Sequence, residues 1–193
     1  MKQILLQFLR QFEELSETDL KALSDLLVTR EVKANTLLVR EGQSCQLCYF
    51  VLQGCLRQYV VQDGVEKTIA IYTENQAVNY FTSQGAAHIA ESYLSSLEPS
   101  VLMVGNPIDD QQLFAQFPAL IEITRKMMEA DLGRVQNELA NTILSNPEQR
   151  YLKLLNDRPD LFQRVPLHMI ASYLGITPES LSRLRKRLQQ RKL

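Results

Sequence analysis

The sequence predicts an α+β chain in which a sandwich or barrel of short strands is followed by one long helix and several short helices. Three observations support this prediction. Short β-branched and aromatic runs recur between residues 32 and 104, a heptad pattern follows Pro118, and basic residues gather at the C-terminal end. A run of strands followed by a run of helices is typical of α+β folds, not of an alternating parallel sheet.

The N-terminal segment is predicted to form two helices. Leu5, Phe8 and Leu9 recur at spacings of three and four, which places them on one face of a helix. Ser16 can cap a second helix because Asp19 lies three positions later, at the spacing of a capping box. We therefore expect an amphipathic helix pair before the strands.

Five short apolar runs between residues 32 and 104 predict strands. They span residues 36–39, 48–52, 56–61, 68–72 and 101–104. Asp63 and Gly64 separate the third run from the fourth, and Asp-Gly between alternating apolar runs is a strong signal for a β-hairpin. Short strands at this spacing favour a sandwich or barrel.

A heptad pattern predicts a long helix over residues 119–144. The side chains that form the pattern are Ile121, Met128, Leu132, Val135, Leu139 and Thr142. A narrow apolar stripe flanked by charged residues is typical of a helix that packs against a copy of itself. We therefore expect a homodimer. The alternative is that this helix packs against the β-domain of its own chain.

The formal net charge of the 193 residues is −1, but the charge is unevenly distributed. Residues 150–193 hold ten basic and three acidic side chains, a net charge of +7, whereas residues 1–149 hold 11 basic and 19 acidic side chains, a net charge of −8. Such asymmetry suggests an acidic module joined to a nucleic-acid-binding module.

The spacing of small and apolar residues between 166 and 193 predicts a helix-turn-helix. Ala171 is small enough for two helices to cross closely, and Gly175, four residues later, suits a tight turn with positive φ. Leu181, six residues after Gly175, continues the apolar contact between the two helices. An ordinary amphipathic helix pair with a solvated basic face is the alternative interpretation.

The second helix of this motif has a well-marked start. Thr177 is a good N-cap, Pro178 suits the first helical position, and Glu179 favours the positive end of the helix dipole. An apolar stripe beginning at Leu181 is expected to face inward. Short polar groups and Arg183 then face outward, as insertion into a DNA major groove requires.

Residues 166–190 resemble the recognition unit of the Crp/Fnr family of bacterial transcription regulators, and the order of the predicted elements is also similar to that family. The resemblance covers nearly the whole chain. It implies a cyclic-nucleotide-binding-like sensor β-roll (a double-stranded β-helix or jelly roll) over residues 1–118. It further implies a dimerisation helix over 119–146 and a helix-turn-helix DNA-binding domain over 147–193.

The stretch TPESLSR, residues 177–183, is similar to the recognition helix of that family. By this match Arg183 would donate two hydrogen bonds to guanine, Glu179 would accept one from cytosine, and Ser182 would touch a neighbouring base. The combination resembles regulators that bind TTGA-type half-sites, which implies a pseudo-palindrome bound by a homodimer. The residues expected to contact the DNA backbone are Thr177, Ser180, Arg185, Lys186 and Arg187.

The sequence departs from the family at the effector pocket. Members that bind cyclic nucleotides have a Gly-Glu pair and, about ten residues later, an Arg followed by a small residue. Residues 75–100 contain no Gly-Glu pair, no Lys or Arg lies between Lys67 and Arg125, and Glu91-Ser92 stand near the expected Arg. A carboxylate there would repel the cyclic phosphate, so we expect no cyclic AMP in the usual manner and no cofactor.

A different effector, or none, remains open. The expected polar lining of any remaining pocket is Asn79, Tyr80, Glu91 and Ser92. The alternative is that these residues belong to the surface of a degenerate loop. A second departure lies at the C-terminus, where the sequence stops at Leu193 and leaves no room for the β-hairpin wing of the family.

The cysteines Cys45, Cys48 and Cys55 number three, which does not supply the four ligands of a closed tetrahedral metal site. We expect Cys48 or Cys55 to be a small core residue and predict no metal site; a thiol redox sensor is the alternative interpretation. No Ser/His/Asp set, phosphate-binding glycine loop or paired-carboxylate motif is present, so we do not expect an enzyme.

No apolar run approaches the roughly 18 residues of a membrane span, and the N-terminus lacks the features of a secretion signal. The leading hypothesis is a cytoplasmic, homodimeric transcription regulator that binds double-stranded DNA, with RNA polymerase as a further possible partner. The main alternative is a cyclic-nucleotide-binding-like sensor or protein-interaction module that does not bind DNA specifically.

Overall fold

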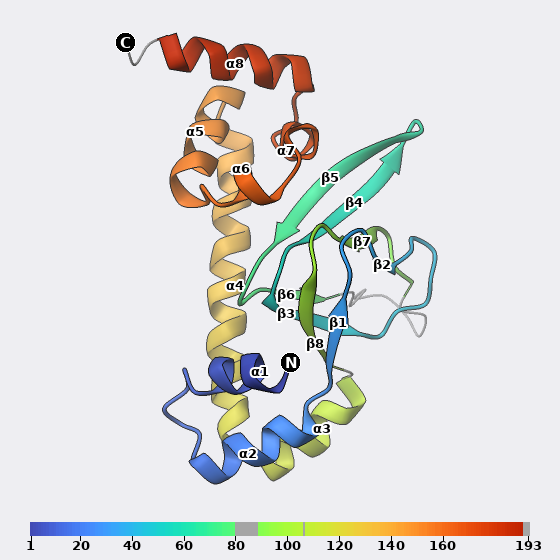
Figure 1. The fold of residues 1–193 in the computed structure, drawn as a ribbon, viewed down its shortest axis with the longest axis vertical. Helices are drawn as coiled ribbons and strands as arrows, with labels where there is room; N and C mark the ends of the chain where they lie inside the picture. The colour runs from blue at the N-terminus through green and yellow to red at the C-terminus, as the bar shows by residue number, and fades with distance from the viewer. Residues whose placement is uncertain (80–88, 106, 191–193) are drawn as a thin grey trace.

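The computed structural model describes residues 1–79, 89–105 and 107–190. One long helix runs along the molecule, with the N-terminal helices at one end, the C-terminal helices at the other and the strands at its side (Figure 1). The α+β prediction is confirmed. None of the helices in the described ranges is both long and apolar enough to cross a membrane.

Two helices form the N-terminal part, α1 (Lys2–Leu9) and α2 (Glu17–Leu26). The predicted capping box is present: the Asp19 N–H donates to the Ser16 hydroxyl, and the Ser16 N–H donates to the Asp19 carboxylate, both at 3.1 Å. Leu5 and Leu23 of these helices are buried against Phe50 of the strand region. The helix pair therefore closes one side of the β-domain.

The strands are β1 (Thr29–Val32), β2 (Leu37–Val39), β3 (Cys48–Gln53), β4 (Leu56–Gln62), β5 (Val65–Tyr72), β6 (Ala77–Asn79), β7 (Tyr93–Ser96) and β8 (Ser100–Gly105). They form two antiparallel sheets of four strands, ordered β1-β8-β3-β6 and β2-β7-β4-β5. Side chains from both sheets, including Val51, Leu56 and Leu102, are buried together between them. The described strands therefore make the β-roll.

All five predicted strands are present, as β2, β3, β4, β5 and β8, but three were missed. The missed strands have the sequences TREV, AVN and YLSS, which are short and partly polar. The helix α3 (Pro107–Gln116) was also missed. These segments lack a strong periodic pattern of their own, and pairing or packing with distant residues decides their conformation.

The Asp-Gly hairpin between β4 and β5 is confirmed. Asp63 and Gly64 have φ values of 53° and 75°, and the register pairs Gln62 with Val65 across the turn. Two consecutive positive φ angles match the two-residue turn whose twist suits a hairpin. Figure 1 shows the resulting β4–β5 ribbon extending beside the C-terminal helices.

The long helix α4 spans Ala119–Leu144, as the heptad pattern predicted. Leu120 and Ile123 are buried against the N-terminal helices, so part of α4 does pack on its own chain. The heptad stripe lies outside this contact: Met128 is 60% exposed and Leu132 is 59% exposed. The helix therefore has one covered face and one uncovered apolar stripe.

Within the described residues, α4 is followed by the predicted short helices, which are α5 (Pro147–Asp157), α6 (Leu161–Arg164), α7 (Leu167–Tyr173) and α8 (Pro178–Gln190). Their core contains Tyr151, Ile170 and Leu181, and it also includes Cys55 and Ile71 of the β-roll. Burial raises the pKa of the Cys55 thiol to about 12, which keeps it protonated. The C-terminal helices and the roll thus share one hydrophobic core.

A substitution of Gly54, in the β3–β4 turn, tests how closely the roll is packed. Its φ is +112°, and an added Cβ would lie 2.7 Å from the backbone Cα of Ser100. Gly54→Ala is expected to lower the free energy of unfolding by roughly 2–4 kcal/mol, through backbone strain and overpacking, as measured by urea unfolding.

Gly133→Ala is the matched control, since Gly133 lies in α4 and an added Cβ there has nothing within 4 Å. It should raise the free energy of unfolding by about 0.5–1 kcal/mol through helix propensity. Equal effects of the two substitutions would contradict the close approach at Gly54.

Candidate nucleic-acid interface

The turn between α7 and α8 has the backbone hydrogen bonds of a Schellman motif. The Gly175 N–H donates to the Ser172 carbonyl and the Ile176 N–H donates to the Ala171 carbonyl, both at 3.0 Å. Gly175 has φ +70°, and Ala171 is fully buried where the helices meet. This geometry agrees with the two predictions, a small residue at the helix crossing for Ala171 and a positive φ in the turn for Gly175.

The start of α8 is capped as its sequence suggests. The Ser180 N–H donates to the Thr177 hydroxyl at 3.2 Å, which satisfies one of the free N–H groups of the first turn. Hydrogen bonding to its own backbone N–H, and then to the Thr177 side chain, lowers the pKa of Glu179. Glu179 is therefore an exposed, ionised acceptor at the N-terminus of α8.

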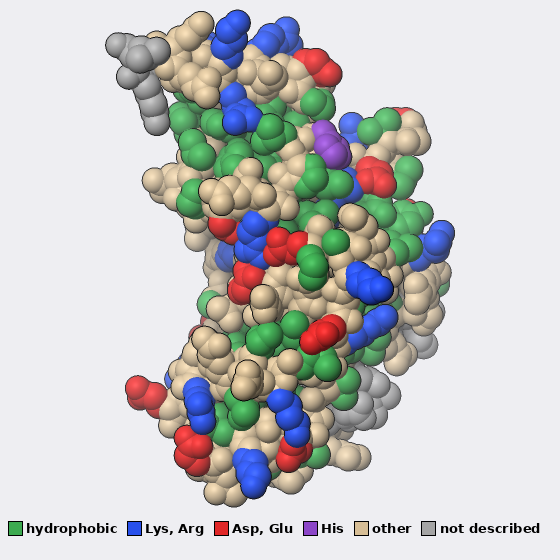
Figure 2. Space-filling view, viewed as in Figure 1, with side chains coloured by type: hydrophobic (Ala, Val, Ile, Leu, Met, Phe, Trp, Pro, Cys, Tyr) green, Lys and Arg blue, Asp and Glu red, His purple; other side chains and the backbone are tan. Residues whose placement is uncertain are grey.

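The two faces of α8 differ sharply in burial. Leu181 and Leu184 are 2% and 6% exposed and pack in the C-terminal core. Six of the eight predicted DNA-contacting side chains are exposed, and Ser180 and Arg185 are half-buried; the exposed six are Thr177, Glu179, Ser182, Arg183, Lys186 and Arg187. Figure 2 shows Lys and Arg side chains along this outer end of the molecule.

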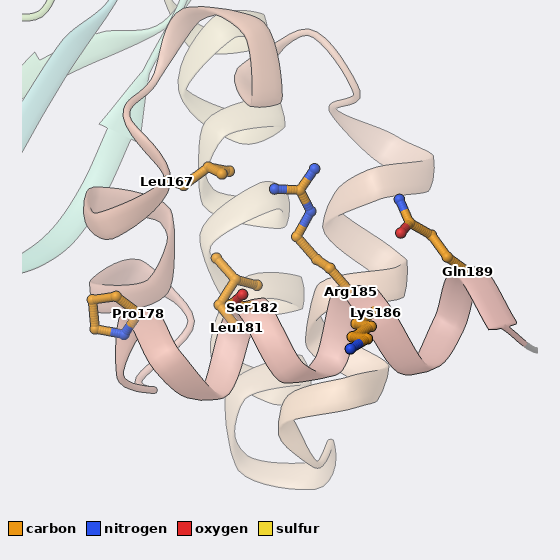
Figure 3. Close-up of a pocket in the computed structure, with 7 residues that line it drawn as sticks. All are labelled: Leu167, Pro178, Leu181, Ser182, Arg185, Lys186 and Gln189. Carbon is orange, nitrogen blue, oxygen red and sulfur yellow. The ribbon is translucent and has the colours of Figure 1, made fainter.

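A groove of about 300 Å³ runs beside α8, lined by Leu167, Pro178, Leu181, Ser182, Arg185, Lys186 and Gln189. In Figure 3 Arg185 extends from α8 toward the side of the groove that holds Leu167. This direction explains why Arg185 is half-buried while its neighbour Lys186 is exposed. Arg183 lies outside the groove, and its guanidinium donates to the Ser180 hydroxyl at 3.3 Å.

Three basic residues of the C-terminal segment serve internal contacts. Arg150 donates to the carbonyl oxygens of Leu174, at 3.0 and 3.2 Å, and Ser145, at 2.6 Å, and so braces the turn before α8. Arg158 and Arg164 contact the roll, the latter through Glu74 and Glu98. The +7 charge counted from the sequence therefore overstates the positive charge that faces outward from this domain.

Two further basic residues form ion pairs near the surface. Lys153 lies 3.0 Å from Asp157 on α5, and Arg187 of α8 pairs with Glu148. Both pairs are exposed enough for solvent to weaken them. Arg187, which the sequence assigns to backbone contacts, would have to exchange Glu148 for a phosphate.

The stripe of α4 presents apolar side chains to solvent. Ile121, Met128, Leu132, Val135 and Leu139 are each between 47% and 60% exposed. Thr142 is exposed too, and its hydroxyl donates to the Glu138 carbonyl at 2.8 Å. A shallow apolar groove of about 350 Å³ lies over the first part of the stripe, beside Phe114 of α3.

Of the four residues predicted to line an effector pocket, Glu91 and Ser92 lie in the described part of the chain and differ in burial. Ser92 is buried and Glu91 is exposed. Asn79 ends β6, where its backbone pairs with Cys48. Tyr80 lies outside the described residues.

Two polar residues of the roll were missed by the sequence interpretation. The Gln58 amide donates to the Ser92 hydroxyl at 2.8 Å, and the Tyr72 hydroxyl donates to the Gln58 carbonyl at 2.7 Å. Burial raises the pKa of Tyr72 to about 12, while the positive charge of Arg134 acts in the opposite direction. This cluster lies beside α4. The sequence signal that could have revealed it is a polar residue at a strand position that faces inward.

The described residues contain no group of three or more His, Cys, Asp or Glu side chains that could hold a metal ion. Cys45 and Cys55 are buried free thiols, and Cys48 is partly buried. The placement of Cys55 in the core agrees with the expectation of a small core residue.

Comparisons with known proteins agree with this architecture. The family model for the cyclic nucleotide-binding domain matches residues 29–104. A probable transcriptional regulator, flp, of Lacticaseibacillus casei is 28% identical over 197 residues, covering 94% of this chain and 85% of the relative. The match with this relative therefore extends well beyond the residues that the family model covers.

Solved structures share the fold at low sequence identity. A CooA mutant from Carboxydothermus hydrogenoformans superposes with a TM-score of 0.67 at 18% identity, covering 96% of this chain and 84% of CooA. A Crp/Fnr-family regulator from Eubacterium rectale gives 0.65 at 17% identity, covering 94% and 88%. Residues 29–104 thus match the cyclic nucleotide-binding domain, and the chain as a whole has the fold of these solved regulators.

Proposed function

We propose that this protein is a homodimer that binds a pseudo-palindromic DNA site through α8. The observation that carries the proposal is the division of α8 into a buried apolar face and an exposed face with Glu179, Ser182 and Arg183. A helix held from behind and polar in front can enter a major groove without losing its contacts to the domain.

The exposed side chains suit distinct DNA contacts. Arg183 can donate two hydrogen bonds to guanine, Glu179 can accept from a cytosine amino group, and Ser182 can touch an adjacent base. The proposed half-site is of the TTGA type. Thr177, Ser180, Arg185, Lys186 and Arg187 are assigned to the DNA backbone, where they position the helix without selecting a sequence.

The exposed stripe of α4 supports the homodimer. Five apolar side chains at heptad spacing present a continuous surface that a second copy of the helix would cover. In that arrangement residues 119–146 form the dimerisation helix between a sensor roll, residues 1–118, and a DNA-binding domain, residues 147–193. We further propose that the dimer acts in the cytoplasm and that RNA polymerase is a partner.

We also propose that the effector pocket is degenerate. The sequence has no Lys or Arg between positions 67 and 125, so these residues supply no side chain to neutralise a cyclic phosphate. Arg57 of the roll is buried but occupied, since it donates to Thr68 at 2.9 Å and pairs with Glu66. Any effector of this roll therefore differs from cyclic AMP in charge or in its mode of binding.

Arg183→Ala tests DNA recognition. It is expected to weaken binding to the selected palindrome by roughly 1–3 kcal/mol, or about 5- to 150-fold in Kd, because the guanine contact is lost. Binding to random DNA should change far less. Selection of bound DNA with the wild-type chain, followed by titrations at two salt concentrations, measures both effects.

Lys153→Ala is the control for this test, since Lys153 is an exposed cation of the same domain paired within α5. It should leave the Kd for the palindrome nearly unchanged. If Arg183→Ala and Lys153→Ala behave alike, the recognition role of α8 is wrong. The alternative of a sensor or interaction module that does not bind DNA specifically then gains support.

Leu132→Glu tests the dimer. Two copies of the glutamate would face each other at the proposed interface, where like charges and lost apolar burial both oppose association. Sedimentation analysis should show a monomer. Val65→Glu, an equally simple change at a 54% exposed valine of the β4–β5 hairpin, should leave the wild-type mass unchanged.

Cyclic AMP itself tests the degenerate pocket. Thermal unfolding in millimolar cyclic AMP should match unfolding in the same concentration of 5′-AMP, which serves as the control. A ligand present at 100 times its Kd would add about 2.7 kcal/mol to the stability of the folded state. A rise in Tm with cyclic AMP alone would overturn the proposal.

A further inference from the structure

We propose that Arg164 is a positioning residue for the recognition helix. Through Glu74 and Glu98 it fastens the C-terminal helices to one end of the β-roll and so sets the direction of α8. We call Arg164 and these two carboxylates the clasp. The inference rests on the proposed function, because it concerns how the same helix is presented to DNA.

The clasp uses the full planar fork of the guanidinium. Nη1 and Nη2 of Arg164 each donate to a different oxygen of Glu74, both at 2.9 Å. Nε and Nη2 donate to Oε1 of Glu98, at 3.1 and 2.6 Å. Nη1 also donates to Asp160 at 3.2 Å. A lysine cannot reproduce this geometry, because its ammonium group is a single point of contact.

The clasp joins turns of the roll that are far apart in the sequence. Glu74 lies between β5 and β6, and Glu98 lies between β7 and β8. Glu74 also accepts a hydrogen bond of 2.8 Å from the Gly54 N–H, in the turn between β3 and β4. Three turns at one end of the roll therefore converge on one arginine of α6. A movement of these turns would be transmitted to the C-terminal helices.

Two further contacts act on the same side of the roll. In the described sheet β5 has β4 as a neighbour on one side only, so its other edge needs partners. The Thr68 N–H of that strand donates to the Ser172 hydroxyl at 2.9 Å, and Arg158 donates to the Ile71 carbonyl at 3.0 Å. The C-terminal helices therefore satisfy the backbone of this edge strand.

These contacts are connected to α8 through α7. Ser172 lies on α7, and α7 packs on α8 through the buried residues Ala171 and Leu181. The clasp, the edge contacts and the shared core hold α6 and α7, and α7 in turn holds α8. In a dimer the angle of α8 relative to α4 would determine the distance between the two recognition helices, and thus the half-site spacing that the dimer accepts.

Arg164→Gln in the full chain tests the proposal. Binding-site selection should use paired half-sites separated by spacers of varied length. The wild-type protein should select one spacing, whereas Arg164→Gln should accept several. Affinity for a single half-site and the salt dependence of binding should stay near wild-type values, because Arg164 contacts the roll and makes no proposed contact with phosphate.

A second measurement does not depend on DNA. Hydrogen exchange of the Thr68 amide reports the docking of α7 on β5, and Arg164→Gln should speed this exchange about tenfold as the helices separate from the roll. Lys153→Gln, which breaks an exposed ion pair of the same domain, is the control and should change neither exchange nor spacing. Glu98→Gln, which removes one carboxylate, replaces Arg164→Gln if that variant does not fold.

The outcomes separate the two proposals. Wild-type exchange at Thr68 together with a single wild-type spacing in Arg164→Gln would overturn the positioning role. If the wild-type protein selects no DNA, the proposed function fails, and the exchange measurement still decides whether the clasp holds the C-terminal helices on the roll. Faster exchange with unchanged spacing would show that the clasp docks the helices without directing α8, which also contradicts the proposal.

Discussion

The contact between the C-terminal helices and the β-roll is the interaction on which the rest of the structure depends. Cys55 and Ile71 of the roll are buried in the same core as Ile170 and Leu181 of the helix-turn-helix. Apolar burial supplies the non-directional part of this contact. The arginines at its edge add directed hydrogen bonds, which define one relative arrangement of the two parts.

Because of this contact, only part of the positive charge of the C-terminal segment faces outward. A count from the sequence treats all ten basic side chains as equal, yet Arg150, Arg158 and Arg164 are hydrogen-bonded inside the molecule. The other basic side chains of this segment that the structure describes lie mainly along α8. The structure therefore separates the basic residues that make internal contacts from those on the exposed face of α8.

Local signals in the sequence predicted most of the helices and the longer strands. Ser16 with Asp19, Asp63 with Gly64, and the glycine of the α7–α8 turn each specify their conformation through short-range hydrogen bonds or φ preference. β1, β6 and β7 were not found, because three or four partly polar residues become a strand only through pairing with distant strands. The same limit applied to the roll interior, where Gln58 meets Ser92 from 34 residues away.

The sequence by itself determined the fold class, the heptad stripe of α4, the cap and turn of the helix-turn-helix, and the absence of Lys and Arg between positions 67 and 125. These properties depend on residue identity and on spacings of a few positions, which the chain carries locally. Only the tertiary structure decided which arginines make internal contacts. It also decided that the roll and the C-terminal helices share a core. The hydrogen bonds between the roll and the C-terminal helices join residues 66 to 104 positions apart, and no local pattern encodes which distant partners meet.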